Sequence, residues 1–281
     1  FLSSTPPFQN AMAMDANRCG IPVVYGFCRG VGSVSYAAAV LLLGFVLERH
    51  APTLLLPVFA ALTACGLLAM SGFRLPERPD EAADRPAEHR SIAAMLRSHP
   101  RFALTLLGCM FFFLTHTISN TYMNALVGKA GGTASAVGTS LAISAVLELP
   151  AMTLVSRLQK RFSPGFFLRF AAGAEVVKFL IFYLARSMPL IYLGQCMQFF
   201  QFAVYAPATV YYVAAALPER DQLKGQSLIY VAGSGLGGAL GNLLGGRLLD
   251  RSGIQAALLL GTVSAAASLL TFCLSTREDS R

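Results

Sequence analysis

Eight apolar segments, each long enough to cross a lipid bilayer, are the feature of this sequence that most restricts its fold. The hydrocarbon core of a bilayer is about 30 Å thick, and a helix needs roughly 20 apolar residues to span it. Short connections rich in Gly, Pro and charged residues separate the segments. The spans are expected near 23–47, 53–73, 101–127, 134–156, 164–186, 189–215, 226–247 and 254–274. Residues 1–14 resemble the end of a further helix, so we expect an all-α, polytopic transmembrane helical bundle of about eight full spans plus part of one.

The composition supports a membrane protein and excludes other classes. Hydrophobic residues make up 55% of the chain and charged residues 13%, whereas soluble domains are about one quarter charged. The net charge of +8 does not indicate nucleic acid, because the basic residues lie singly among apolar runs. The six cysteines form no CxxC and no Cys/His cluster, so we expect no metal or cofactor. Because the chain begins with Phe, we expect it to start inside a longer protein.

A charged, proline-containing segment at 74–100 divides the apolar spans into two groups. Its composition predicts a solvated linker, with a short surface helix near 91–98. We therefore expect three parts: the end of an N-terminal helical bundle at 1–73, the linker at 74–100, and a C-terminal six-helix bundle at 101–281. Alternate connections carry 15 and five Lys and Arg residues. The positive-inside rule places the linker and the C-terminus in the cytoplasm, in a multi-pass protein of the cytoplasmic or inner membrane.

A few ionisable residues lie at membrane depth, where each one is costly unless it has a partner or a wet cavity. They are Arg29, His116, Glu148, Glu175 and Lys178. Arg29 lies among small residues that let another backbone approach, and its guanidinium suits a carboxylate of the protein or of a substrate. Alternatively, it extends to the lipid headgroups. Glu148 lies near the middle of its span, and it is the first choice for a substrate or proton site; the alternative is an ion pair that fixes helix register.

The other ionisable residues leave alternatives open. Glu175 and Lys178 are three residues apart, so they share one helix face and either pair with each other or serve function. Lys178 can also reach across to Glu148. His116 begins a polar face that continues through Ser119, Asn120 and Asn124; either it is a hydrogen-bonded structural residue or it faces a polar cavity.

Two further patterns follow helical spacing. Amides and tyrosines form one stripe along 189–215, which suits sugar hydroxyls or flat polar solutes; its members are Gln195, Gln198, Gln201, Tyr205 and Tyr212. Four glycines at steps of four predict a helix-packing surface rather than a nucleotide loop; they are Gly233, Gly237, Gly241 and Gly245.

The order of spans, the central linker, "YGFCRGVGS" and "VLELPAM" resemble the major facilitator superfamily, nearest to its lactose-permease-like oligosaccharide or aromatic-acid proton symporters. The resemblance covers nearly the whole chain and implies the end of helix 4 followed by helices 5–12. It implies substrate contacts at the matching residues, namely Arg29, Ser33, Asn124 and Glu148, with Lys178 in the place of a helix-9 arginine. Gln198 and Gln201 stand where this family has a titratable pair on helix 10. Proton coupling would then fall to His116, Glu148 or Glu175, or the coupling ion differs, or transport is uncoupled.

The leading hypothesis is a secondary active transporter, not an enzyme, that moves a small polar solute by alternating access between two bundles, as a proton-coupled monomer. The solute is a sugar or oligosaccharide, a nucleoside, or an aromatic acid. The substrate-binding residues are predicted to be Arg29, Ser33, Asn124, Glu148, Gln195, Gln198 and Tyr205, and the proton-coupling residues are sought among His116, Glu148, Glu175 and Lys178. The alternatives are efflux of hydrophobic drugs by proton antiport and, from another class, an intramembrane enzyme.

Overall fold

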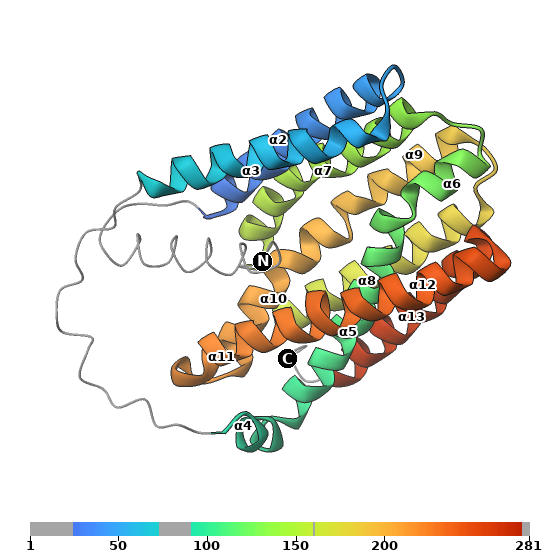
Figure 1. Ribbon diagram of the computed structural model, residues 1–281. Coiled ribbons are helices and arrows are strands. Elements are labelled where there is room, and N and C mark those ends of the chain that lie inside the picture. Colours follow the sequence, from blue (N-terminus) through green and yellow to red (C-terminus); the bar gives the residue numbers. More distant parts are fainter. Residues whose placement is uncertain (1–24, 73–90, 160, 277–281) are drawn as a thin grey trace.

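The computed structural model describes residues 25–72, 91–159 and 161–276, with side chains from residue 31 onward in the first helix. Every regular element in these ranges is helical (Figure 1). The first group of elements comprises α2 (Tyr25–Leu47), η2 (Pro52–Leu54), α3 (Leu55–Ser71), α4 (Ile92–Ser98), α5 (Pro100–Thr121), α6 (Met123–Lys129) and α7 (Ala134–Leu158). The second comprises α8 (Pro164–Leu184), α9 (Met188–Cys196), η4 (Met197–Phe199), α10 (Phe202–Ala216), α11 (Glu219–Tyr230), η5 (Val231–Gly237), α12 (Gly238–Ser252) and α13 (Ile254–Ser275).

The predicted spans all appear as helices, with three internal irregularities. The segment expected at 101–127 ends as α5 at Thr121 and resumes as the short α6. The segment at 189–215 is interrupted by the 3₁₀ turn η4, and the one at 226–247 is longer than predicted and contains the π-helical η5. The expected surface helix near 91–98 is α4, which begins after Ser91, whose hydroxyl accepts a hydrogen bond from the Ala94 N–H.

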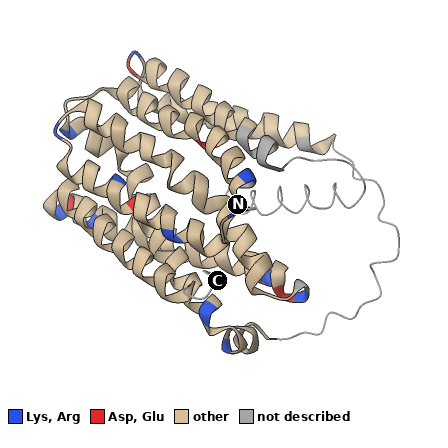
Figure 2. Ribbon diagram, turned by 180° about the vertical axis from the view of Figure 1, so that it is seen from behind, with Lys and Arg blue, Asp and Glu red and all other residues tan. Residues whose placement is uncertain are grey.

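Five stretches of the described chain are long and apolar enough to span a membrane, namely Pro100–Thr121, Ala134–Val155, Met188–Ala216, Arg220–Ser252 and Ile254–Ser275. Shorter apolar helices occur in α2 and α3. Helix α8 is apolar as well, but it carries Arg169, Glu175 and Lys178. Figure 2 shows charged residues mostly near helix ends and few along their middles. The chain is a multi-pass membrane protein.

Side chains from α5 to α13 pack into two apolar clusters at different levels of the bundle. The first contains Phe102, Phe112 and Tyr205, and the second contains Phe182 and Ile191. Along α8, residues 167–172 belong to the first cluster and residues 179–185 to the second. The buried polar side chains of α8 and of the η4 region therefore lie between two apolar layers, at mid-depth.

The predicted glycine surface is confirmed as a packing surface. A Cβ atom on Gly241 would lie 2.6 Å from the Leu114 carbonyl oxygen, and one on Gly233 would lie 2.7 Å from the Phe113 ring. A Cβ atom on Gly237 would likewise clash with the α5 backbone, and one on Gly245 would clash with the Tyr122 ring. The small residues let η5 and α12 approach α5 at backbone distance.

Helix α2 packs along α7 (Figure 1). Ala37 is buried against Ala142 and Ala145. Farther along the two helices, toward the end of α2, their backbones come closer still. A Cβ atom on Gly138 of α7 would lie 2.6 Å from the Val40 carbonyl oxygen and 3.2 Å from the Gly44 Cα of α2. We call this contact between α2 and α7 the α2–α7 seam.

Candidate functional site

A chain of hydrogen bonds connects α2, α7, η4 and α8 at the level between the apolar layers. The Ser33 hydroxyl donates to Glu148 Oε2 at 2.7 Å, and the Gln198 amide donates to Glu148 Oε1 at 3.1 Å. The Lys178 ammonium in turn donates to Gln198 Oε1 at 2.8 Å. We call Ser33, Glu148, Lys178 and Gln198 the Glu148 cluster. One carboxylate and one amide in it connect segments up to 165 positions apart in the chain.

The Glu148 cluster places opposite charges at the two ends of a neutral amide. Lys178 is 2% exposed, and its Nζ also lies 5.6 Å from the centre of the Phe182 ring, within the range of a cation–π contact. Glu148 is half-buried, and both of its oxygens accept a hydrogen bond. Bonds to charged groups in a site with little water are strong and costly to break, so Gln198 fixes the relative positions of α7 and α8.

A second polar group, the Glu175 cluster, lies beside the first and consists of His116, Asn120, Glu175 and Gln201. Glu175 is fully buried. Gln201 Nε2 donates to Glu175 Oε1 at 3.0 Å and lies 3.5 Å from His116 Nδ1. Asn120 Nδ2 lies 3.0 Å from His116 Nε2, and the imidazole stacks on Phe202 with ring centres 4.3 Å apart. Glu175 Oε2 and Gln201 Oε1 are buried atoms without a hydrogen-bond partner among the described residues.

The two clusters show how Glu175 and Lys178 are partnered, while their functional roles stay predictions. The two side chains face the same region, but neither hydrogen bonds to the other within the described structure. Each instead bonds a different glutamine, and Lys178 reaches Glu148 through Gln198. An intervening amide thus replaces the direct ion pair.

The interruption of the helix at η4 places both glutamines. Residues 197–199 form a 3₁₀ turn, and Gln201 has φ −100° and ψ −94°, outside the helical region, before α10 begins. A continuous helix would keep Gln198 and Gln201 on one face. With the turn between them, Gln198 points to Glu148 while Gln201 points to Glu175.

Three predicted site residues make no side-chain hydrogen bond to either cluster within the described structure. Gln195 is 1% exposed, but its amide donates to Met123 Sδ at 3.7 Å. Tyr205 is buried in the apolar layer and stacks on Phe112 with ring centres 3.9 Å apart. Asn124 is exposed on α6, because the helix that would have continued from His116 ends at Thr121. Gln195 and Asn124 therefore do not join the polar faces predicted from spacing, whereas Tyr205 packs against Phe202, the ring that stacks on His116. The predicted binding roles of the three residues stay predictions.

Arg29 lies in α2, four residues before Ser33. Its side chain lies outside the described part of the structure. The predicted meeting of Arg29 with Glu148 stays a prediction.

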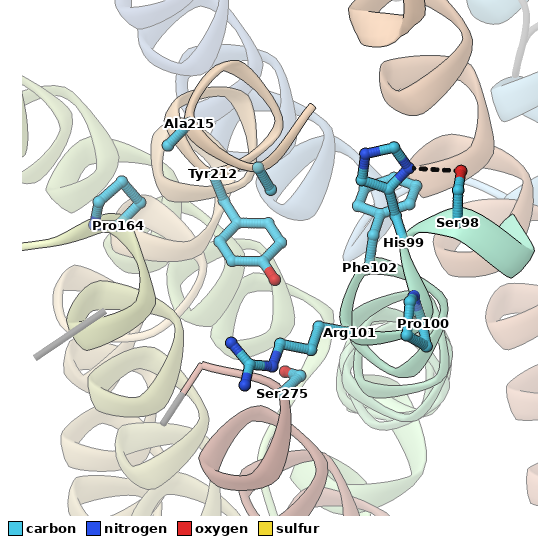
Figure 3. A pocket seen from close by; sticks show the side chains of 10 residues that line it. Ser98, His99, Pro100, Arg101, Phe102, Pro164, Tyr212, Ala215 and Ser275 are labelled. Atoms are coloured by element: carbon cyan, nitrogen blue, oxygen red, sulfur yellow. Dashed lines mark hydrogen bonds between the residues drawn. The ribbon is translucent and has the colours of Figure 1, made fainter. Parts of the chain in front are cut away.

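A cavity of about 540 Å³ opens at the end of the bundle where α5 and α8 begin (Figure 3). Arg101, Tyr212 and Ser275 line it, and Figure 3 shows the Arg101 side chain extending toward Ser275. The Thr105 hydroxyl donates to the Tyr212 hydroxyl at 3.0 Å. Tyr212, the last member of the predicted stripe, therefore belongs to this end of the bundle rather than to the Glu148 cluster.

One polar contact between the end of α2 and the start of α7 is not predicted by helical spacing. Glu48, directly after α2, accepts a hydrogen bond from the Thr133 hydroxyl at 2.6 Å and one from the Ser135 N–H at 3.3 Å. The available signal was a carboxylate directly after one span and a Thr directly before another. Sequence spacing alone does not pair residues 85 positions apart.

Comparison with known proteins assigns this arrangement of helices to a family. Residues 14–260 match the model of the MFS_1 like family. The chain belongs to this family. The resemblance to the major facilitator superfamily inferred from the sequence is thus confirmed, and this is a family of transporters rather than enzymes.

Two curated relatives of this MFS_1 like protein are similar along most of its length. A maltose permease of Geobacillus stearothermophilus is 28% identical over 257 residues, which cover 91% of this chain and 64% of that protein. The uncharacterized transporter YwbF of Bacillus subtilis (strain 168) is 23% identical over 258 residues, with 92% and 64% covered. The chain therefore spans slightly less than two thirds of the length of each relative.

Solved structures show the same fold. A structure of the E. coli fucose:proton symporter FucP aligns with a TM-score of 0.60 at 17% identity and covers 93% of this chain and 70% of that one. Another FucP structure, in the outward conformation, aligns with a TM-score of 0.55 at 17% identity, with 82% and 59% covered. At this identity the likeness concerns the arrangement of helices alone.

Proposed function

We propose that this protein is a secondary active transporter for a sugar or a similar small polar solute, and that the solute binds at the Glu148 cluster. The observation that carries the proposal is the bond between Ser33 on α2 and Glu148 on α7 at 2.7 Å. In the proposed division of the chain, residues 1–73 and 101–281 belong to different bundles. A ligand bound between these two helices would then contact both bundles, as alternating access requires.

The chemistry of the Glu148 cluster suits a solute rich in hydroxyl groups. Glu148 accepts hydrogen bonds, Lys178 donates them, and Ser33 and Gln198 do both. A sugar hydroxyl can replace Ser33 as a donor to the Glu148 carboxylate. Where it displaces the Gln198 amide from Glu148, the same hydroxyl can accept a hydrogen bond from that amide. The names of the relatives, a maltose permease and a fucose:proton symporter, favour a sugar over the hydrophobic drugs of the efflux alternative.

For coupling we propose that Glu175 carries the proton and that Glu148 binds the solute. Glu175 is fully buried, and its Oε2 has no partner among the described residues, whereas both oxygens of Glu148 are bonded. A buried carboxyl group with an unpaired oxygen is expensive to keep charged. Protonation removes this cost and turns the Glu175 carboxyl group into a hydrogen-bond donor. After rotation of the Gln201 amide, its unpartnered Oε1 can accept that hydrogen bond.

The proposed orientation places the linker and the C-terminus in the cytoplasm, because the connections on that side carry the excess of Lys and Arg. The α2–α3 connection and the start of α7 then lie on the outer face of the cell membrane. The transporter would act as a monomer in this orientation.

The test is uptake of labelled maltose, fucose and an aromatic acid by the full-length gene product in proteoliposomes, with and without an inward proton gradient. Glu148→Gln should abolish binding and transport of the accepted solute. Glu175→Gln should retain exchange of internal for external solute but lose accumulation driven by the gradient. Asp250→Asn, at an exposed carboxylate on α12, is the matched control and should leave both activities intact. Unchanged uptake by Glu148→Gln would refute the assignment of the site.

A further inference from the structure

The N-terminus of α7 is capped by a residue that directly follows another helix, α2. Thr133 is the N-cap residue of α7, but its side chain makes no capping hydrogen bond. Its hydroxyl instead donates to Glu48 Oε1 at 2.6 Å, and the same oxygen accepts from the Ser135 N–H at 3.3 Å. Glu48 thus takes the role that an N-cap side chain ordinarily fills.

This arrangement is favourable for two physical reasons. The first N–H groups of a helix lack partners within the helix, and a side-chain oxygen that accepts from them stabilises it. The N-terminus also carries a partial positive charge, which favours a carboxylate at that position. Both gains depend on the position of α2, because Glu48 lies 87 residues before Ser135 in the chain. The cap therefore exists only while the end of α2 lies against the start of α7.

The same end of the α2–α7 seam is tightly closed. Gly44 and Gly138 bring the backbones together, with 2.6 Å between a Cβ on Gly138 and the Val40 carbonyl oxygen. Ala37 and Ala142 are buried deeper along the seam. Glu48 follows Ser33 by 15 residues, about 22 Å along a helix. The seam therefore covers the Glu148 cluster from the side on which Glu48 lies.

We propose that Glu48 is a latch that holds the outer end of the α2–α7 seam closed by capping α7 from α2. The proposal rests on the proposed function, in which α2 and α7 belong to bundles that move apart. When the seam opens, the carboxylate leaves, and the Thr133 hydroxyl becomes free to rotate and cap α7 itself. The Glu48 carboxylate is the stronger of the two caps, because its charge also interacts favourably with the helix N-terminus. Glu48 therefore favours the closed form without touching the solute.

The experiment measures the opening of the seam directly. Ala142→Cys, at a position 4% exposed within the seam, provides a reporter in a variant whose other exposed cysteines are replaced. A membrane-impermeant maleimide is added to the outer side of right-side-out vesicles, and labelling after denaturation in SDS gives the total. Removing the Glu48 cap should raise the labelling rate in Glu48→Ala by up to about fivefold, since Thr133 can then cap α7 in the closed form as well. Glu48→Gln, which keeps an acceptor oxygen without the charge, should give a smaller rise.

The controls separate the latch from general damage and from the transport proposal. Lys129→Ala changes an exposed charge at the same end of the bundle and should leave labelling at the parental rate. The native Cys109 is fully buried and should stay unlabelled in Glu48→Ala without the reporter, which shows an intact fold. Equal labelling of Glu48→Ala and the parent would overturn the latch. Because labelling needs no solute, faster labelling of Glu48→Ala supports the latch even if none of the tested sugars is transported.

Discussion

Replacement of Gln198 by leucine should destabilise the protein strongly, because this one amide satisfies two charged groups. The Lys178 ammonium donates to its oxygen at 2.8 Å, and its nitrogen donates to Glu148 at 3.1 Å. Lys178 is 2% exposed, so water cannot readily replace the lost acceptor. Removing one partner of a buried charge costs about 3–5 kcal/mol. We therefore expect Gln198→Leu to lower the unfolding free energy by about this amount.

The matched control is Gln195→Leu. Gln195 is the same residue type in the same segment and is 1% exposed, but its amide donates to the weak acceptor Met123 Sδ at 3.7 Å. Its replacement removes no partner of a charge, so we expect a loss of about 1 kcal/mol or less. The assay is thermal unfolding of both variants, purified in the same detergent, with Gln198→Leu melting at the lower temperature.

A double variant tests the mechanism rather than the size of the effect. If the cost of Gln198→Leu comes from an unpaired ammonium, then adding Lys178→Met removes the charge and should recover most of the stability, since apolar replacements of buried ion pairs are often neutral. Equal melting of the two leucine variants, or a double variant less stable than Gln198→Leu alone, would refute the reasoning.

Three further predictions concern other parts of the molecule. Hydrogen bonds from Ser135 and Thr133 at the start of α7 hold the pKa of Glu48 below its ordinary value. The closed seam is therefore favoured above the pKa of the open form and loses this advantage as the pH falls through the lower pKa of the closed form. Because maleimide reacts with the thiolate, the two variants are compared at each pH, and labelling of the seam reporter in the parent should rise relative to Glu48→Gln as the pH falls. Gly237→Val places a side chain against the α5 backbone and should lower the melting temperature, whereas Gly173→Val, with no atom within 4 Å of its Cβ position, should cost little. Tyr212→Phe removes the hydroxyl that accepts from Thr105 and should cost about 1 kcal/mol in thermal unfolding.

The sequence by itself determined the spans and the level of the site. Apolar runs of membrane length can satisfy their backbone groups only as helices, which is why the predicted segments appear as α2, α3, α5 and the later helices. A charge within such a run is costly unless it has a partner, so Glu148, Glu175 and Lys178 stood out without any structure. The four-residue glycine spacing was similarly sufficient to predict the packing surface on η5 and α12.

The tertiary structure alone decided which of these residues meet. Local spacing assumes a continuous helix, and the 3₁₀ turn at 197–199 and the end of α5 at Thr121 break that assumption. The pairing of Gln198 with Lys178 and Glu148, and of Glu48 with the start of α7, depends on how distant helices pack. A side chain satisfies its hydrogen bonds with whichever group packing brings within about 3 Å, and sequence separation carries no record of that distance.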